Sequence, residues 1–504
     1  MKTPRCMHIS CALALLIAVS TATALPQIPP EIQAYRDEPK GVVSERREWV
    51  LDGNRIRTLF QNTGQVAQWP YQPSGEWPRG SGHSYLDGYA ILVAASVVAP
   101  GIGSRIHPVE TFYREEMDYD PMTGEMWGFN PVPGYRNLSS TSPAMSYDPA
   151  TWPEAWGGKW YGMAGPDSLN ATVETYFVMD DSKDGEWSRP PVDFFPVLTD
   201  SGRGGLGLRV EARGFQWADS VARDILIFRY DVVNISDCDY DSTVFGIFMD
   251  PGVGGTNNSG NSARYDVTHD MVYAWNPSGI GLPGDWQTGF LGLLFLETPA
   301  REPPATDPIG LSSCAIETLS DKGITGTWPK NDDMMWTRMT GGFVDTVLHN
   351  TNFVVVATTG PFALSKWTRK QFSTALVFAD GLAELFEEAE TARKIASIGY
   401  HLPQPTGAGP VIEKEIPVCV HLYQNYPNPF NPSTTVRYDL PRASRVTMTV
   451  FNSLGQEVAV LVNEEEPAGR HTVKFEAGSL ASGVYLCRLS AGDFVATRRL
   501  ILMK

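Results

Sequence analysis

Alternation of apolar and polar residues with a period of two constrains the fold of this chain more than any other feature of its sequence. Apolar side chains occupy every second position in residues 226–232 and again in residues 245–249. Successive side chains of a β-strand point to opposite faces, so this period predicts strands. Ile225 and Ile227 make the other face of the first segment apolar as well, which predicts a sheet covered on both faces. We expect one hairpin, with residues 234–242 as its connection.

The composition agrees with a mainly β fold. The chain has 47 Gly and 38 Pro among 504 residues, and 11% of its residues are aromatic. An ordinary chain has a combined Gly and Pro share of about 12%, so this one is rich in turns. Apolar residues recur every three or four positions over residues 381–400, which predicts one long helix. The expected body, residues 25–400, is a large β-sandwich-like structure with this helix at its C-terminal end.

The net charge limits the partners of the chain. Asp and Glu number 57 against 40 Lys and Arg, which gives a formal charge of −17 at pH 7. A charge of this sign repels phosphate backbones and anionic lipid surfaces. We therefore expect no nucleic-acid partner.

The first 24 residues form a predicted signal peptide. Lys2 and Arg5 precede an apolar stretch over residues 12–19, and Ala22-Thr23-Ala24 has the small-x-small pattern cut by signal peptidase. An apolar stretch of about eight residues is far shorter than the roughly 20 that span a bilayer. We expect export, with no transmembrane anchor in the mature chain.

Residues 90–99 are the longest apolar stretch of the mature body. They are closed by Pro100 and Gly101, so they predict a buried strand and not a membrane segment.

The cysteines of the mature chain are spaced too widely for a zinc motif, and their compartment permits disulfides. They are Cys238, Cys314, Cys419 and Cys487. A Cys238–Cys314 bridge stays open, and Cys487 is interpreted as a small buried apolar residue.

A second domain is predicted after a Pro- and Gly-rich linker over residues 401–421. No Trp follows Trp367, and residues 422–504 show several short segments with a period of two, separated by turns such as residues 452–455 and 491–493. About six strands in this length predict a small β-sandwich.

The motifs of this second domain resemble a known family. Their order along residues 422–504 is similar to that of the type A C-terminal sorting domain of the type IX secretion system. The motif residues are Asn425, Tyr426, Pro427, Asn428, Pro429, Phe430, Asn431, Pro432, Gly455, Gly469 and Gly483. The resemblance implies an Ig-like module that carries cargo across the outer membrane through the type IX machinery. It also implies release into the medium or attachment to surface lipopolysaccharide.

Three segments of the body, residues 204–217, 245–252 and 360–364, resemble parts of large, uncharacterised exported proteins with the same kind of tail. This resemblance transfers no activity.

Local catalytic signatures are missing from the sequence. Residues 202–207 satisfy G-x-G-x-x-G, but the following residues 208–217 predict a strand where a dinucleotide site needs a helix. No H-E-x-x-H occurs, and no serine has glycine at both −2 and +2. The body histidines are isolated, and we expect no hydrolase activity that depends on them; they are His83, His107, His269, His349 and His401.

Acidic turns are candidate calcium ligands. Asp180, Ser182 and Asp184 occupy positions 1, 3 and 5 of a calcium-like loop with Gly185 at position 6, but Pro191 stands where an EF-hand has Glu. The alternating acids Asp237, Asp239 and Asp241 form a second candidate. No cofactor is required by the sequence, and calcium is the one these turns indicate. A solvated acidic turn is the alternative interpretation of each.

Tryptophan gives the body a candidate sugar-binding surface. Several of the 14 Trp lie in Gly- and Pro-rich segments such as residues 152–160, with Glu154 and Asp167 nearby. Exposed rings beside two carboxylates would suit a glycosidase, whereas buried rings would fill a large β core.

Three functions therefore stay open for the body. The favoured one is an exported structural, adhesive or ligand-binding protein at the cell surface or in the medium, with surface glycan or lipopolysaccharide as a partner. The alternatives are a secreted glycan-directed hydrolase and a component of an envelope assembly.

Overall fold

The structure is a computed structural model. It describes residues 27–112, 119–120, 122–124, 126–301, 307–318, 331–342, 347–348, 351–402, 420–422, 425, 430–478, 480–492 and 494–503. The predicted signal peptide, most of the predicted linker, His349, Cys419 and residues 426–429 of the sorting motif lie outside the described residues.

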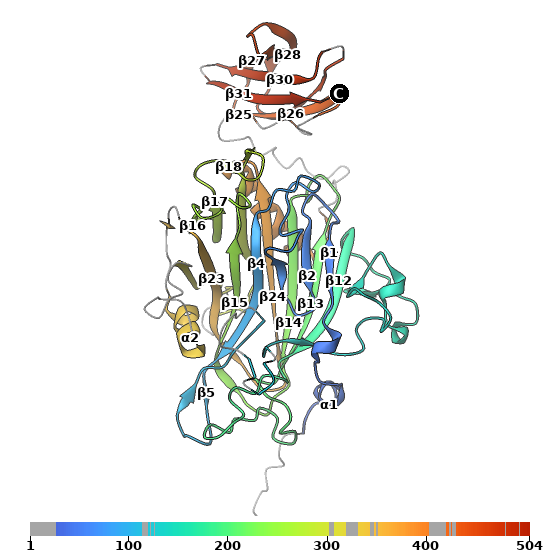
Figure 1. Cartoon of the computed structure of the whole chain (residues 1–504), viewed down its shortest axis with the longest axis vertical. Helices are drawn as coiled ribbons and strands as arrows, with labels where there is room; N and C mark the ends of the chain where they lie inside the picture. Colours follow the sequence, from blue (N-terminus) through green and yellow to red (C-terminus); the bar gives the residue numbers. More distant parts are fainter. Residues whose placement is uncertain are drawn as a thin grey trace, which may run out of the picture.

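The body consists of two antiparallel sheets (Figure 1). The first sheet has eight strands, in the order β1 (Glu48–Leu51), β2 (Thr58–Gln61), β3 (Val66–Gln68), β4 (Leu86–Ala95), β15 (Tyr240–Pro251), β23 (Phe353–Leu364) and β21 (Ser313–Thr318), with β7 (Val109–Thr111) paired to β4. The second sheet has ten, in the order β22 (Val347–Leu348), β16 (Ser262–Asp266), β17 (Met271–Trp275), β20 (Phe290–Glu297), β24 (Arg369–Ala379), β14 (Ile225–Asn234), β13 (Leu208–Gln216), β12 (Val173–Asp180) and β8 (Asn130–Pro131), with β9 (Ala144–Met145) paired to β12.

One core joins the two sheets. Alternate residues of β4 and β15 from the first sheet, and of β13 and β14 from the second, lie in the same apolar cluster. The body is therefore a β-sandwich, as the alternation predicts. Every residue of β4 is buried, which confirms a buried strand over residues 90–95. The rest of the predicted segment, residues 96–99, lies outside β4, and Val98 is exposed.

The predicted hairpin is wrong. Both predicted strands exist, but β14 pairs with β13 and β24 in the second sheet, whereas β15 pairs with β4 and β23 in the first. The connection between them crosses the sandwich. A period of two identifies a strand and its faces, but it carries no information about the neighbouring strand.

Helices cover part of each outer face. Helix α3 (Leu382–Ser397) confirms the predicted long helix, and its apolar side packs on Ile225 and Ile227 of β14. Helix α2 (Asp332–Thr340) packs Met335 and Met339 on the outer face of the first sheet. The Asn331 side chain caps α2 by accepting the Met334 N–H.

Shorter elements complete the body. They are α1 (Pro30–Asp37), η1 (Val43–Glu45), η2 (Pro149–Thr151), η3 (Glu154–Trp156), and the two-stranded ribbons β5 (Val97–Val98) with β6 (Arg105–Ile106), β10 (Tyr161–Gly162) with β11 (Gly165–Pro166), and β18 (Ile280–Gly281) with β19 (Trp286–Gln287).

The C-terminal strands, red in Figure 1, form a small sandwich with its own core. One sheet has the order β25 (His421–Leu422), β26 (Ser433–Leu440) and β29 (Gly469–Glu476); the other has β28 (Glu457–Glu466), β27 (Ser444–Asn452), β30 (Gly483–Ala491) and β31 (Phe494–Leu502). Cys487 of β30 is buried in this core, as expected.

The Cys238–Cys314 bridge left open by the sequence does not form, because both thiols are free. Across the described residues, no helix is long and apolar enough to cross a membrane.

Candidate functional site

The outer face of the second sheet carries charged side chains at its centre. In β13, the alternate residues from Leu208 to Ala212 belong to the core, so the residues between them point to the opposite face. Strand pairing sets Glu211 beside Asp231 and Arg213 beside Arg229 of β14. We call this group the charged face; its members are Arg209, Glu211, Arg213, Arg229 and Asp231.

Apolar clusters flank the charged face along β14. Toward one end, Ile225 and Ile227 pack under α3. Toward the other, Val233 packs with Ile32 of α1. The alternation that makes both faces of β14 apolar is thus interrupted only at Arg229 and Asp231, between the two apolar clusters that α3 and α1 help to form.

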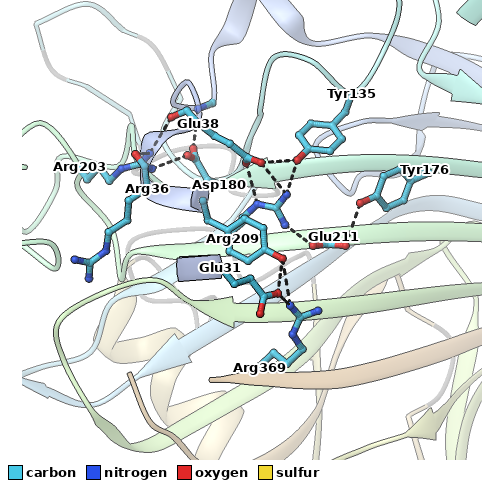
Figure 2. Close-up of polar contacts among 12 residues, drawn as sticks. Glu31, Arg36, Glu38, Tyr135, Tyr176, Asp180, Arg203, Arg209, Glu211 and Arg369 are labelled. Atoms are coloured by element: carbon cyan, nitrogen blue, oxygen red, sulfur yellow. Dashed lines mark hydrogen bonds and ion pairs between the residues drawn. The ribbon is translucent and has the colours of Figure 1, made fainter. Parts of the chain in front are cut away.

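Arg209 is the centre of a buried ion-pair network (Figure 2). Its Nε lies 3.1 Å from Glu38 Oε2, its Nη1 pairs with Glu211, and its Nη2 donates to the Tyr135 hydroxyl at 2.6 Å. The guanidinium also stacks over the Tyr35 ring, 4.0 Å from its centroid. Arg209 itself is 2% exposed. Segments far apart in the sequence therefore meet on this one cation.

The network changes the titration of its members. Burial would raise the pKa of Glu211, but the Arg209 charge and hydrogen bonds from Arg209 and Tyr176 outweigh it and hold that pKa below its usual value. Burial and a hydrogen bond to Glu31 raise the pKa of Tyr35 to about 12. Burial would lower the pKa of Arg209, but Glu211, Tyr135 and Glu38 raise it instead. With these shifts, the Arg209–Glu211 pair is charged near neutral pH.

The first calcium candidate is already bonded to protein groups. Asp180 accepts from Arg203 Nη1 at 3.0 Å, from the Gly41 N–H at 2.9 Å and from the Ser182 hydroxyl at 2.7 Å. Asp184 is buried and accepts the Glu186 N–H at 3.0 Å. In Figure 2, Arg203 and Asp180 adjoin the Arg209 network.

The glycine-rich loop before β13 closes over the same turn. The Asp181 carboxylate accepts the backbone N–H groups of Leu206 and Leu208 at 2.8 and 2.9 Å. Gly205 has a φ of +60°, and a Cβ there would lie 2.7 Å from Asp181 Cγ, so the position requires glycine. The strand expected after this loop is confirmed as β13. Gly205, within the G-x-G-x-x-G match, thus allows this loop to pack closely against Asp181.

The second calcium candidate is spread over several partners. Asp237 forms an ion pair with Arg36 at 2.8 Å, Asp239 accepts the Lys366 N–H at 2.9 Å, and Asp241 is exposed on β15. Within the described ranges, no group of three or more His, Cys, Asp or Glu side chains is arranged to hold a metal. Calcium at either turn stays a prediction.

A melting experiment tests that prediction. A ligand that binds only the folded form raises the melting temperature by mass action. If calcium binds at Asp180, Ser182 and Asp184 or at Asp237, Asp239 and Asp241, the mature chain should melt at a higher temperature in excess calcium than in excess chelator. Coincident melting curves in the two buffers would show that calcium does not bind at either turn.

The tryptophan-rich segment is partly core and partly surface. Trp160 is 2% exposed and packs with half-buried Trp152 and Trp156 on β12. The two proposed catalytic acids are both exposed: Glu154 lies in η3, and Asp167 accepts the Trp160 N–H at 3.0 Å. Asp167 therefore stabilises the loop that carries Trp160.

The histidines have aromatic neighbours. His83 stacks on Trp286, His107 on Trp336 and His269 on Phe386, with ring centroids 4.1, 4.9 and 3.8 Å apart. His107 and His269 also contact Asp333 and Asp266 through Nδ1 at 2.8 and 2.9 Å. His401, the fourth described histidine of the body, contacts Asn170.

The described residues of the sorting motif anchor the start of the C-terminal domain. Asn425 is buried and donates to the Thr434 hydroxyl at 2.9 Å. Phe430 is buried, and its backbone bonds Ile501 and Met503 at the end of the chain. Gly455 lies in a turn with a φ of +77°, Gly469 and Gly483 begin β29 and β30, and Asn431 and Pro432 are exposed.

Residues 424–503 match a family model described as the secretion system C-terminal sorting domain. The chain carries a type IX sorting tail. This sorting domain indicates export by the type IX secretion system to the cell surface or the extracellular space. The match lies entirely within the C-terminal sandwich and the segment that enters it.

Similarity over the body is weak. No curated protein matches the sequence. A solved polysaccharide lyase aligns with 9% identity and a TM-score of 0.21 over 58% of this chain and 34% of its own, and the heparan sulfate lyase HepC from Pedobacter heparinus with 9% identity and a TM-score of 0.23 over 83% and 42%. PorZ, a surface component of the type IX secretion system of Porphyromonas gingivalis, aligns with 11% identity and a TM-score of 0.13 over 92% and 57%. The chain spans less than two thirds of each of these structures, and TM-scores this low do not indicate a shared fold.

Sequence reasoning missed the charged face. The signal that could have found it is the charge pattern Arg-x-Glu-x-Arg over residues 209–213, inside a predicted strand, together with Arg229-x-Asp231 in the next one. Charged side chains at alternate positions of strands that are otherwise apolar on both faces mark a place where the sheet is not covered by apolar groups.

Proposed function

We propose that this chain is an extracellular or cell-surface binding protein that the type IX system delivers through its sorting domain. The observation that carries the proposal is the pairing of that domain with a body in which exposed Tyr161 lies beside a buried arginine of the charged face, Arg213. A surface glycan or lipopolysaccharide is the partner class in keeping with this location.

The arrangement of the candidate catalytic groups supports binding over hydrolysis. Glu154 and Asp167 are exposed on a loop, and Asp167 is hydrogen-bonded to the backbone of that loop. A glycosidase needs two carboxylates that face one another across the bond to be cleaved. His107 and His269 each contact an acid, but a triad also needs a nucleophile beside the base.

We expect the mature chain to show no turnover of chromogenic ester, peptide and glycoside substrates, while a glycan array reveals binding. The matched variants are Glu154→Gln, Asp167→Asn, His107→Ala and His269→Ala, each checked for an unchanged melting temperature. Turnover by the wild type that either carboxylate variant abolishes would indicate that the protein is a glycosidase and not a binding protein. Turnover lost in either histidine variant would indicate a different hydrolase, and an array without any bound glycan would contradict the glycan partner.

A further inference from the structure

Arg213 differs from the other arginines of the charged face. It is 7% exposed, and its Nη1 is buried with no hydrogen-bond partner. Among the described residues, no carboxylate lies within ion-pair distance of it, whereas Arg209 pairs with Glu38 and Glu211. A buried cation without an anionic partner is costly. Glu174 and Glu211 attract the Arg213 charge from beyond ion-pair distance, but they leave its Nη1 N–H unpaired. This N–H is therefore a free donor for an anionic group.

The strand register also favours an anion at Arg213. Arg213 lies directly opposite Arg229 on β14, and like charges opposite each other destabilise a sheet. Arg229 is compensated, because its Nη1 lies 3.1 Å from Asp231 Oδ2 and its Nε lies 3.8 Å from Glu297. Arg213 is stacked against aromatic rings, with its guanidinium carbon 4.1 Å from the Tyr176 ring centroid and 5.6 Å from that of Tyr161, while Glu174 and Glu211 act on it only from beyond ion-pair distance. An anion bound here would give Arg213 the direct ion pair that Arg229 already has.

Aromatic rings continue from Arg213 to the surface. Tyr161 of β10 stacks on Tyr176, with centroids 5.0 Å apart and planes at 25°, and Trp156 stacks on Tyr161 at 5.5 Å and 27°. Tyr161 is 49% exposed. An exposed ring presents a flat apolar surface that suits the C–H face of a sugar ring. A guanidinium and such rings, side by side, suit a ligand that is both cyclic and anionic.

We propose that Arg213, Tyr161 and Trp156 form a subsite for an acidic saccharide, in which Arg213 binds the carboxylate of a uronic acid residue and Tyr161 stacks on a sugar ring. The inference rests on the binding function proposed above and names the ligand class. A planar carboxylate matches two N–H groups of a guanidinium, which a single point charge does not require. The formal charge of −17 opposes polyanions of high charge density, so recognition depends on this local contact and not on a basic surface.

Titration calorimetry of the mature chain with hexagalacturonate tests the subsite. The wild type should bind, and Arg213→Gln should weaken binding roughly tenfold or more, the usual consequence of removing a charged hydrogen bond. Arg213→Lys should fall between them, because it keeps the charge and loses the planar fork. Tyr161→Ala should also weaken binding. The matched control is Tyr71→Ala, which removes a 62% exposed tyrosine elsewhere and should leave the affinity unchanged.

The outcomes separate this inference from the binding function itself. Equal affinity in wild type, Arg213→Gln and Tyr161→Ala would overturn the subsite, as would binding of neutral cellohexaose or of a sulfated galactan hexasaccharide in preference to hexagalacturonate. If hexagalacturonate fails while another array glycan binds, the subsite is wrong and the binding function stands. If no glycan binds at all, both fail. If Arg213→Gln does not fold, Tyr161→Ala decides, because its side chain lies at the surface.

Discussion

Arg209→Ala is expected to lower the free energy of unfolding of the body by about 3 kcal/mol or more, the usual cost of breaking a buried ion pair from one side. The variant leaves Glu38 and Glu211 without their shared cation and removes the group that Tyr35 covers at 4.0 Å. Urea denaturation followed by tryptophan fluorescence measures the effect. All Trp residues precede position 368, so this signal reports the body alone, even in the full mature chain.

The matched control for this experiment is an exposed ion pair in the same body. Arg301 and Asp307 lie 3.2 Å apart with side chains 53% and 65% exposed, and Arg301→Ala should cost less than about 1 kcal/mol. If Arg209→Ala lowered the free energy of unfolding by no more than Arg301→Ala does, the Arg209 network would not be an important source of stability.

The stability difference should also depend on pH. The pKa of Glu211 lies below its ordinary value of 4.5 in the folded body. A carboxyl with a lowered pKa stabilises the fold above its unfolded pKa, and that stabilisation is lost as the pH falls through the folded pKa. The difference between wild type and Arg209→Ala should therefore be constant from pH 7 to about 5 and shrink below 4.5.

The sequence predicted where β14 and β15 lie in the chain, but it did not predict which strands they pair with. A period of two identified both strands, and apolar spacings of three and four over residues 381–400 identified helix α3. Both signals arise because burial of one face imposes a period on each element separately. They did not identify the partners of β14 and β15. Both strands are apolar over much of both faces, so either could pair with several neighbours, and a short connection can serve a hairpin or a crossing between sheets.

The site was harder to predict than the fold for a similar reason. Glu38, Tyr135 and Arg209 are far apart in the sequence, and they meet only because the end of α1 and the segment after β8 both reach Arg209 of β13. The acids that do cluster in the sequence, at residues 180–184, instead bond to Arg203 and to backbone N–H groups. Spacing along the sequence can identify a loop whose own residues bond to one another. It cannot identify the charged face, because that face is assembled from separate strands.

Removal of residues 422–504 is expected to stop delivery of the protein altogether while leaving the body folded. The body and the sorting domain have separate apolar cores, and a domain with its own core folds without its neighbour. The truncated chain keeps residues 1–24, so we expect it to reach the periplasm and remain there. Cell fractionation with detection of the body measures its distribution, and the tryptophan melting curve of the retained chain checks that it is folded.

Two further chains make that experiment decisive. Arg301→Ala in the full-length protein should be exported like the wild type, because it changes the body without touching the sorting domain. Residues 401–504 attached to a periplasmic reporter protein should carry the reporter out of the cell. The contacts of the motif residues Asn425 and Phe430, with Thr434, Ile501 and Met503, all lie within this segment, so we expect it to fold and act without the body. Export depends on the sorting domain alone only if both results hold. A truncated body that reached the surface or the medium as efficiently as the full chain would show instead that the body carries a signal of its own.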